Sequence, residues 1–280
     1  MVTAERRSAS ATDAAGTIAP VAAETGTRAV DRALSVLHLF VGTKSSWTLT
    51  EVARASGFTV STAHRLLKAL LAHELIALDP QTRAYTLGVE VMRLARGIID
   101  SEDRHRLQVV AHPELERLRD LSGETVGLHV RITRNRVCIA ELSSPHALRL
   151  ASTVGGVQPL HAGAASKALL AWLPDAQRAD LLNGDLPRLT PLTITDAAVF
   201  DSELQEIRQR GYAISQGESV AGASAASAPI FGMDGSVVAV INVTGPIDRF
   251  DRTAINAIAP DLLNSTKMIS EQLGFQPHED

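Results

Sequence analysis

Cysteine and long apolar runs are nearly absent from this chain. Its 280 residues include one cysteine, Cys138, so no intramolecular disulfide can form and no cluster of thiolates can hold a metal ion. Its longest apolar stretches, such as 237–243, are much shorter than the roughly 20 residues of a membrane-spanning helix. Arg6 and Arg7 are not followed by the apolar segment of an export signal. We therefore expect a cytoplasmic protein with no membrane partner.

The motifs of common enzyme classes are missing as well. The chain contains no G-x-G-x-x-G, no phosphate-binding loop and no H-E-x-x-H, and His105 and His112 are poorly spaced for metal ligation. Ser224 lies in Gly-Ala-Ser-Ala-Ala (222–226), which resembles a nucleophile elbow except for its last residue. The only histidine after it, His278, lies in the polar C-terminal tail. We expect no enzyme activity, no metal and no cofactor, and a serine hydrolase that uses Ser224 is an alternative.

Charge and composition divide the chain into regions. Residues 1–26 are rich in Ala, Ser and Thr, which predicts a disordered tail, and 275–280 are expected to form a second tail. From Arg28 to Arg96, nine Lys and Arg residues face five Asp and Glu residues, whereas the remainder is acidic. The length suits two globular domains, and a basic N-terminal unit suits a protein that contacts phosphates with one end.

The N-terminal unit is predicted to contain a helix-turn-helix. A first helix is indicated by an i, i+3, i+4, i+7 pattern of apolar residues: Val30, Ala33, Leu34 and Leu37. Thr48 and Glu51 form a capping-box pattern, so a second helix begins there and runs to about residue 56. Gly57 supplies the positive φ of a tight turn, Phe58 is an apolar plug, and Thr59 is placed to cap a third helix.

The third helix is followed by a predicted wing. The apolar stripe of this helix consists of Val60, Ala63, Leu66, Leu67 and Leu70. Strands over 75–78 and 85–87 flank a turn over 79–83, which places Arg83 near the tip of a hairpin. The combination predicts a winged helix-turn-helix, whose third helix enters the major groove of DNA.

Polar and cationic side chains outside the apolar stripe are suited to base edges and phosphates. We expect double-stranded operator DNA to contact nine residues: Arg28, Arg32, Thr59, Ser61, Thr62, His64, Arg65, Lys68 and Arg83. The alternative is that ordinary core helices and a hairpin carry these groups as solvated side chains.

Eight segments resemble the IclR-type (isocitrate lyase regulator) family of transcription factors. Those similar to its DNA-binding half are RALSVL (32–37), LTEVA (49–53), STAHRLL (61–67) and YTLG (85–88). Those similar to its effector domain are PLHA (159–162), SKALLA (166–171), RGY (210–212) and VTGP (243–246). The resemblance covers about residues 28–274 and implies a bacterial regulator. Two positions depart from it, because the family often has Lys at Val60 and Gly at Glu74.

A linker helix is predicted over residues 89–104, between a DNA-binding domain (27–88) and an effector-binding domain (105–274). Its helical spacing is carried by Val91, Leu94, Ala95 and Ile98. The alternative is a helix that packs only on its own domain. The resemblance implies instead that it joins DNA-binding domains into a homodimer or homotetramer, as an operator with two half-sites requires by symmetry.

The second domain is predicted to be mixed, so the fold class of the whole chain is α+β. Helices are expected over 107–121, 164–173, 202–211 and 251–274, and strands over 125–132, 137–142, 223–230 and 237–244. Strands in pairs, flanked by helices, favour a largely antiparallel sheet. The resemblance implies a GAF/PAS-like effector-binding domain.

A small organic acid is the expected effector. The helix that begins at Ala164 and Ala165 offers free backbone N–H groups and the positive end of its dipole, which suits a carboxylate. The resemblance implies further effector contacts at Ser215, Ala225, Asn242 and Thr244. Several relatives have cysteine or serine at three of these positions, so their effectors are not transferred to this chain. In the alternative interpretation, Asn242 and Thr244 cap a sheet edge and Lys167 is a solvated charge.

We therefore predict a metabolite-responsive DNA-binding regulator, a repressor of a catabolic operon controlled by a small organic acid. The alternative from another class is a metabolite-binding module without DNA activity, whose N-terminal helices would contribute nothing to function. Removal of residues 1–100 separates the two, because it would abolish DNA binding only in a regulator.

Overall fold

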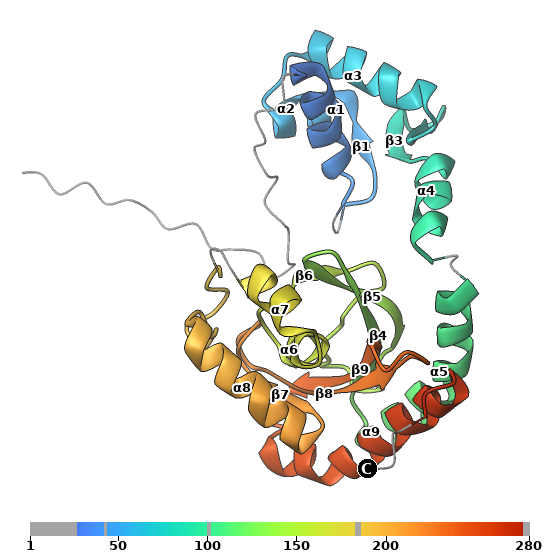
Figure 1. Cartoon of the computed structure of the whole chain (residues 1–280). Coiled ribbons are helices and arrows are strands. Elements are labelled where there is room, and N and C mark those ends of the chain that lie inside the picture. The colour runs from blue at the N-terminus through green and yellow to red at the C-terminus, as the bar shows by residue number, and fades with distance from the viewer. Residues whose placement is uncertain (1–26, 42–43, 100–101, 183–185, 277–280) are drawn as a thin grey trace, which may run out of the picture. The chain divides into compact units, whose positions relative to one another are not determined.

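Two compact units form the part of the chain that the computed structural model describes, residues 27–41, 44–99, 102–182 and 186–276. The division falls between residues 101 and 102, and Figure 1 labels elements of both units where there is room. No helix within the described ranges is long and apolar enough to cross a membrane. The predicted tail over residues 1–26 lies outside these ranges.

The N-terminal unit combines helices with a small antiparallel sheet. Its helices are α1 (Arg28–His38), α2 (Leu49–Ser56), α3 (Val60–Ala72) and α4 (Val89–Ile99). Its strands are β1 (Trp47–Thr48), β2 (Ile76–Leu78) and β3 (Ala84–Leu87), in the order β1-β3-β2. The predicted hairpin corresponds to β2 and β3. Strand β1 was not predicted, because two residues are too few to show an alternating pattern.

The core of this unit corrects two of the predicted apolar faces. Its fully buried members are Val36, Phe40, Val52, Ala53, Ala63, Leu67, Leu70, Ile76 and Tyr85. Helix α1 packs through Val36, and Ala33 and Leu37 of the predicted stripe are partly buried against the same core. The other two residues of that stripe, Val30 and Leu34, are 53% and 46% exposed. The buried face is rotated from the predicted one and shares two residues with it, because periodicity alone does not fix the exact centre of an apolar face. Val60 is also exposed, because the core contacts of α3 begin one turn later at Ala63.

The described residues of the predicted linker over 89–104 belong to two different units. Helix α4 covers residues 89–99 in the N-terminal unit, and residues 102–104 belong to α5 (Glu102–Ser122) of the C-terminal unit. The expected C-terminal tail also begins too early at residue 275. The Phe275 ring stacks on Phe231, with ring centroids 5.1 Å apart, so this residue is part of the C-terminal unit.

The C-terminal unit contains one six-stranded sheet, and every strand pair in it is antiparallel, as predicted. The strands are β4 (Thr125–Ile132), β5 (Asn135–Leu142), β6 (Val157–Pro159), β7 (Ala213–Gln216), β8 (Ala223–Phe231) and β9 (Val237–Pro246). Their order is β6-β5-β4-β9-β8-β7. The other helices are α6 (Ala164–Ala171), α7 (Asp175–Leu182), α8 (Ala197–Arg210) and α9 (Arg252–Gln272). Strands β6 and β7 and helix α7 were not predicted.

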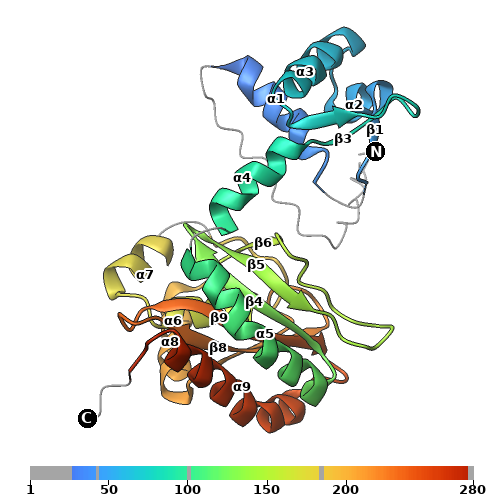
Figure 2. The ribbon, with the colours of Figure 1, turned by 90° about the vertical axis from the view of Figure 1, so that its right-hand side faces the viewer.

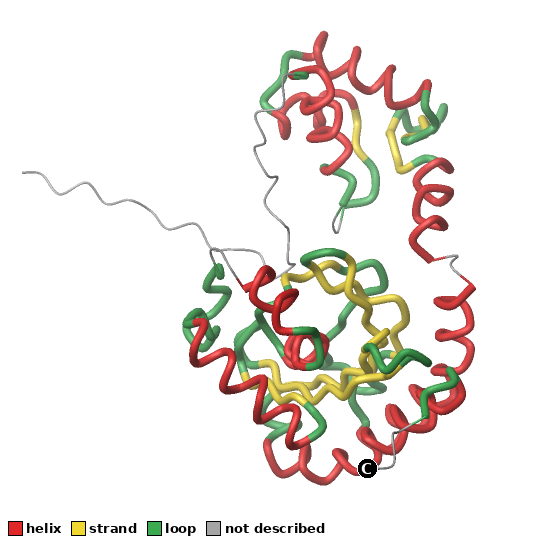
Figure 3. The backbone as a smooth tube through the Cα atoms, viewed as in Figure 1, coloured by secondary structure: helices red, strands yellow, loops and turns green. Residues whose placement is uncertain are grey.

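Each face of this sheet supports a separate apolar core. Helices α5 and α9 lie side by side on one face, as both Figure 1 and Figure 2 show, and pack against residues such as Leu128, Ala228 and Ile241. Helices α6 and α8 form the second core with Ala213, Ala225 and Val240. Figure 3 shows the strands curling around α6. We call the face of the sheet that packs against α6 the inner face.

Candidate functional site

The helix-turn-helix forms through the local contacts that its sequence predicts. The Thr48 backbone N–H donates to the Glu51 carboxylate over 2.9 Å at the start of α2. The Lys44 ammonium, 2.6 Å from Glu51, lowers the pKa of this carboxyl to about 2, with help from Thr48. Gly57 ends α2 in the left-handed conformation, with φ of 71°. The Thr59 hydroxyl then accepts from the Thr62 backbone N–H over 3.2 Å and caps α3.

Helix α3 carries a row of exposed polar side chains that have no partner among the described residues. Ser61, His64, Arg65 and Lys68 are exposed and form no hydrogen bond or ion pair with any residue that the structure describes. The Thr62 hydroxyl instead accepts a hydrogen bond from the Thr59 hydroxyl over 2.9 Å. Thr59 and Thr62 therefore act first in the helix cap, whereas the other four side chains are available to a partner.

The remaining predicted DNA contacts lie on α1 and the wing. Arg28 is exposed at the first residue of α1. The Arg32 guanidinium lies 5.6 Å from the centre of the Phe58 ring, so it also packs against the apolar plug between α2 and α3. Arg83 is exposed in the turn between β2 and β3, with a left-handed φ of 57°. In the same turn the Asp79 carboxylate accepts from the Gln81 N–H over 2.8 Å, which fixes the wing.

The predicted effector residues of the sheet come together on its inner face. Ser215 pairs with Ala225, and Ala225 pairs with Thr244, across three adjacent strands. Asn242 lies two residues along β9 on the same face, opposite Gly127 of β4. The Asn242 side chain is 5% exposed, and its Oδ1 atom accepts no hydrogen bond from any described residue. The Thr244 hydroxyl donates to the Ser224 carbonyl over 3.2 Å.

The start of α6 is packed against this face. Ala164 and Ala165 are buried in the second apolar core, and all eight residues of α6 are buried. The backbone of Gly163, directly before the helix, acts to lower the pKa of the Glu218 carboxyl, so this carboxylate lies close to the helix start. The predicted acid-binding end of α6 is therefore already in contact with a carboxylate of the same chain.

Lys167 is buried rather than solvated, which corrects the alternative considered for it. Its side chain is 1% exposed, and its Nζ atom lies 3.0 Å from Glu203 and 2.7 Å from Glu218. Burial raises the pKa of Glu218, against the lowering effect of Lys167. Removal of one partner from such a buried ion pair typically costs about 3–5 kcal/mol. The three residues therefore hold α6, α8 and the loop after β7 together.

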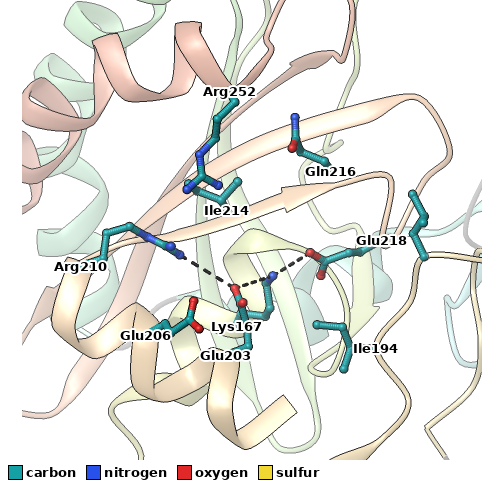
Figure 4. A pocket seen from close by; sticks show the side chains of 10 residues that line it. Lys167, Ile194, Glu203, Glu206, Arg210, Ile214, Gln216, Glu218 and Arg252 are labelled. Carbon is teal, nitrogen blue, oxygen red and sulfur yellow. Dashed lines mark hydrogen bonds and ion pairs between the residues drawn. The ribbon is translucent and has the colours of Figure 1, made fainter. Parts of the chain in front are cut away.

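A pocket of about 360 Å³ lies beside this ion-pair cluster (Figure 4). Besides Lys167, Glu203 and Glu218, its lining includes Arg210 and Arg252. None of the six predicted effector residues lines it, so it is separate from the predicted effector contacts. Sequence reasoning missed it because its charged residues come from distant segments and share no motif.

A second buried cation was also missed. Arg136 on β5 is 9% exposed, and its guanidinium donates to His129 Nδ1 over 3.1 Å and to the Gln158 side chain over 2.5 Å. Val137 packs toward α5 and α9, so the alternation of β5 places Arg136 on the inner face. The alternation of β5 could have placed Arg136 on the inner face from the sequence alone. An arginine on one face of a strand, however, normally predicts that this face is exposed to solvent.

The hydrolase alternative loses its structural basis. Ser224 lies within strand β8 and is paired with Gly245, whereas a nucleophile elbow requires a turn between a strand and a helix. Its side chain is fully buried. His278, the only histidine after it, lies outside the described residues.

Two family models together match most of the chain. The model of the IclR helix-turn-helix domain matches residues 29–80, and that of the bacterial transcriptional regulator IclR C-terminal domain matches residues 100–271. The HTH-type transcriptional repressor AllR of Salmonella typhimurium is 30% identical over 256 residues, which is 91% of this chain and 93% of that protein.

Solved structures are similar over the same length. The Thermotoga maritima IclR structure has a TM-score of 0.72 and 25% identity, and the match covers 88% of this chain and 98% of that one. An IclR homolog from Microbacterium hydrocarbonoxydans, complexed with 4-hydroxybenzoate, has a TM-score of 0.71 and 25% identity over the same shares of the two chains.

Proposed function

This chain belongs to the IclR family of bacterial transcriptional regulators, and we propose that it represses a catabolic operon under the control of a small organic acid. The observation that carries the proposal is the polar row on α3. Four side chains on this helix are exposed and have no partner within the described chain: Ser61, His64, Arg65 and Lys68. Such side chains read base edges and contact phosphates in the major groove.

The similar proteins support the sign of regulation and the class of effector. AllR of Salmonella typhimurium is named as a repressor, and the Microbacterium homolog is complexed with an aromatic carboxylate. The effector contacts that we propose are Ala164, Ala165, Ser215, Ala225, Asn242 and Thr244. An acid bound there changes DNA affinity only if it binds the DNA-competent and DNA-incompetent arrangements unequally.

We propose that the regulator works as a homodimer or homotetramer in the cytoplasm, on a roughly palindromic operator. Helix α4 supports self-association, because Val89, Met92 and Leu94 are 61%, 69% and 59% exposed. A helix with several exposed apolar side chains favours burial against another surface. A two-fold dimer places its two recognition helices on two half-sites.

Fluorescence anisotropy tests the DNA-binding proposal directly. The full chain is titrated against the DNA upstream of its own gene and of the adjacent operon, with unrelated DNA as competitor. We expect Arg65→Ala to cost about 1–3 kcal/mol of operator binding and to relax sequence preference, if Arg65 makes a bidentate base contact. Arg83→Ala removes a phosphate contact, so the slope of log K against log salt should fall by about 0.9.

Arg134→Ala is the matched control, because Arg134 is an exposed arginine of the C-terminal unit, 3.5 Å from Asp180. It should leave operator binding unchanged. Unchanged affinity and preference in Arg65→Ala would refute the role of α3. If the wild-type chain shows no selectivity at any salt concentration, the protein is a metabolite-binding module instead.

A further inference from the structure

Arg136 differs from the other buried cations of the C-terminal unit. Among the described residues, the buried lysine and arginine side chains are Arg136, Lys167 and Arg178. Lys167 lies between two glutamates, and Arg178 lies 2.9 Å from Asp175 and 3.1 Å from Asp201. Arg136 forms no ion pair with any described carboxylate. A buried charge without a counter-charge is costly, so its presence calls for an anionic partner.

The neighbours of Arg136 leave its charge uncompensated. Burial and the nearby guanidinium lower the pKa of His129 well below its usual value, so the imidazole is neutral. Burial raises the pKa of the Cys138 thiol to about 12, so this neighbour on the same face is not a thiolate. Burial lowers the pKa of Arg136 to about 10, which still leaves the guanidinium protonated at neutral pH.

The contact with Arg136 fixes the proton of His129. The guanidinium can only donate, so His129 Nδ1 accepts and the proton of the neutral ring lies on Nε2. That buried Nε2–H has no acceptor within the described chain. Nε2 lies 2.7 Å from the position that a Cβ on Gly127 would take, and Gly127 is the cross-strand partner of Asn242. The unpaired donor therefore lies over Gly127, the residue that pairs across the strands with Asn242, whose Oδ1 is also unpaired among the described residues.

The cation also adjoins the start of α6. Arg136 Nη2 lies 3.9 Å from the position of a Cβ on Gly163, the residue that precedes this helix. The Gly163 backbone already acts on the Glu218 carboxyl, whose pKa it helps to lower. The positive group that remains for an incoming acid is thus the guanidinium of Arg136.

We infer that Arg136 is the residue that receives the acid group of the effector, and that the effector is a small hydroxy acid. Its carboxylate accepts from the Arg136 guanidinium and from His129 Nε2–H, and its hydroxyl donates to Asn242 Oδ1. This inference rests on the proposed function, because it assigns the effector chemistry of the same inner face. Gln158 is a positioning residue, since it holds the second nitrogen of the guanidinium.

Arg136→Met tests the assignment through two readouts that move in opposite directions. Without ligand, the variant should melt a few degrees above the wild type, because an uncompensated buried charge is replaced by an apolar side chain of similar length. The probes are lactate, malate and 4-hydroxybenzoate, and the uncharged amide of each acid is tested as its control. Acid binding is measured by thermal shift, and its affinity for Arg136→Met should be about tenfold or more weaker than for the wild type. The amides should change the melting temperature of neither the wild type nor the variant.

Two further variants sharpen the result. Arg131→Met is the matched control, because Arg131 is the cross-strand neighbour of Arg136 on β4 and is only half-buried; it should keep the acid response. Asn242→Leu should bind lactate no better than propionate, whereas the wild type should prefer lactate.

Three outcomes would overturn the inference: a lower melting temperature for ligand-free Arg136→Met, an acid response equal to that of the wild type, or no acid response in the wild type. The second leaves the proposed function intact if the acids still change operator affinity. The third refutes acid control itself, while selective operator binding in the anisotropy assay would still establish the DNA-binding regulator.

Discussion

Glu74 adopts a left-handed backbone conformation, with φ of 54°, where the chain leaves α3 for the wing. This is the position at which the family often has glycine, and a non-glycine residue there costs about 1–2 kcal/mol. Glycine also gains freedom in the unfolded chain, which offsets about 0.4–1 kcal/mol. We expect Glu74→Gly to raise the unfolding free energy of the N-terminal unit by about 0.5–1 kcal/mol, measured by chemical denaturation.

Gly88 provides the control for this prediction. It packs against the backbone of Glu74, and a larger residue at Gly88 should destabilise the unit, whereas glycine at position 74 should stabilise it. A Cβ at Gly88 would lie 2.1 Å from the carbonyl oxygen of Glu74, so alanine cannot fit without backbone movement. Gly88→Ala should destabilise the unit by about 1–3 kcal/mol, as overpacking does. If both substitutions change the unfolding free energy by the same amount, the backbone before the wing adjusts to either residue, and the prediction is wrong.

The cap of helix α3 links the stability of the N-terminal unit to DNA binding. The Thr59 hydroxyl accepts from the Thr62 N–H, and removal of such a cap costs about 1 kcal/mol. We expect Thr59→Ala to lower the unfolding free energy by that amount. Thr59→Asp restores the cap but places a negative charge near phosphates, so it should keep stability and lose operator affinity. If Thr59→Asp binds the operator as tightly as the wild type, the N-terminal end of α3 does not enter the major groove.

The elements whose ends carry capping or turn chemistry were predictable from the sequence. Gly57, Thr59 and the strand over 125–132 lie where the pattern placed them, because each depends on contacts within a few residues. Strand β7 was missed because its four residues follow α8 closely, and their burial depends on β8 and α6. Arg136 was missed for a related reason. Its environment is made by β4, β6 and α6, and no local pattern reports those distant partners.

The charge of the chain is divided unevenly between its two units. The segment from Arg28 to Arg96 is basic, whereas the remainder is acidic, and the net charge is −4. Since phosphates repel the acidic unit, the basic unit alone should determine the salt dependence of DNA binding. In the proposed dimer, two such units would double the number of phosphate contacts, so self-association should raise both the operator affinity and the salt slope.

Helix α4 provides the test of that assembly. Met92 and Leu94 are exposed on this helix in the single chain, and lysine at both positions should prevent their burial against a second copy. We expect Met92→Lys/Leu94→Lys to shift the protein toward the monomer in light scattering. Its salt slope should be about half that of the wild type, because a monomer contacts one half-site. Val199→Lys on α8, where Val199 is 56% exposed, is the control for added charge. A double variant that keeps both the mass and the operator affinity of the wild type would place the dimer contact outside α4.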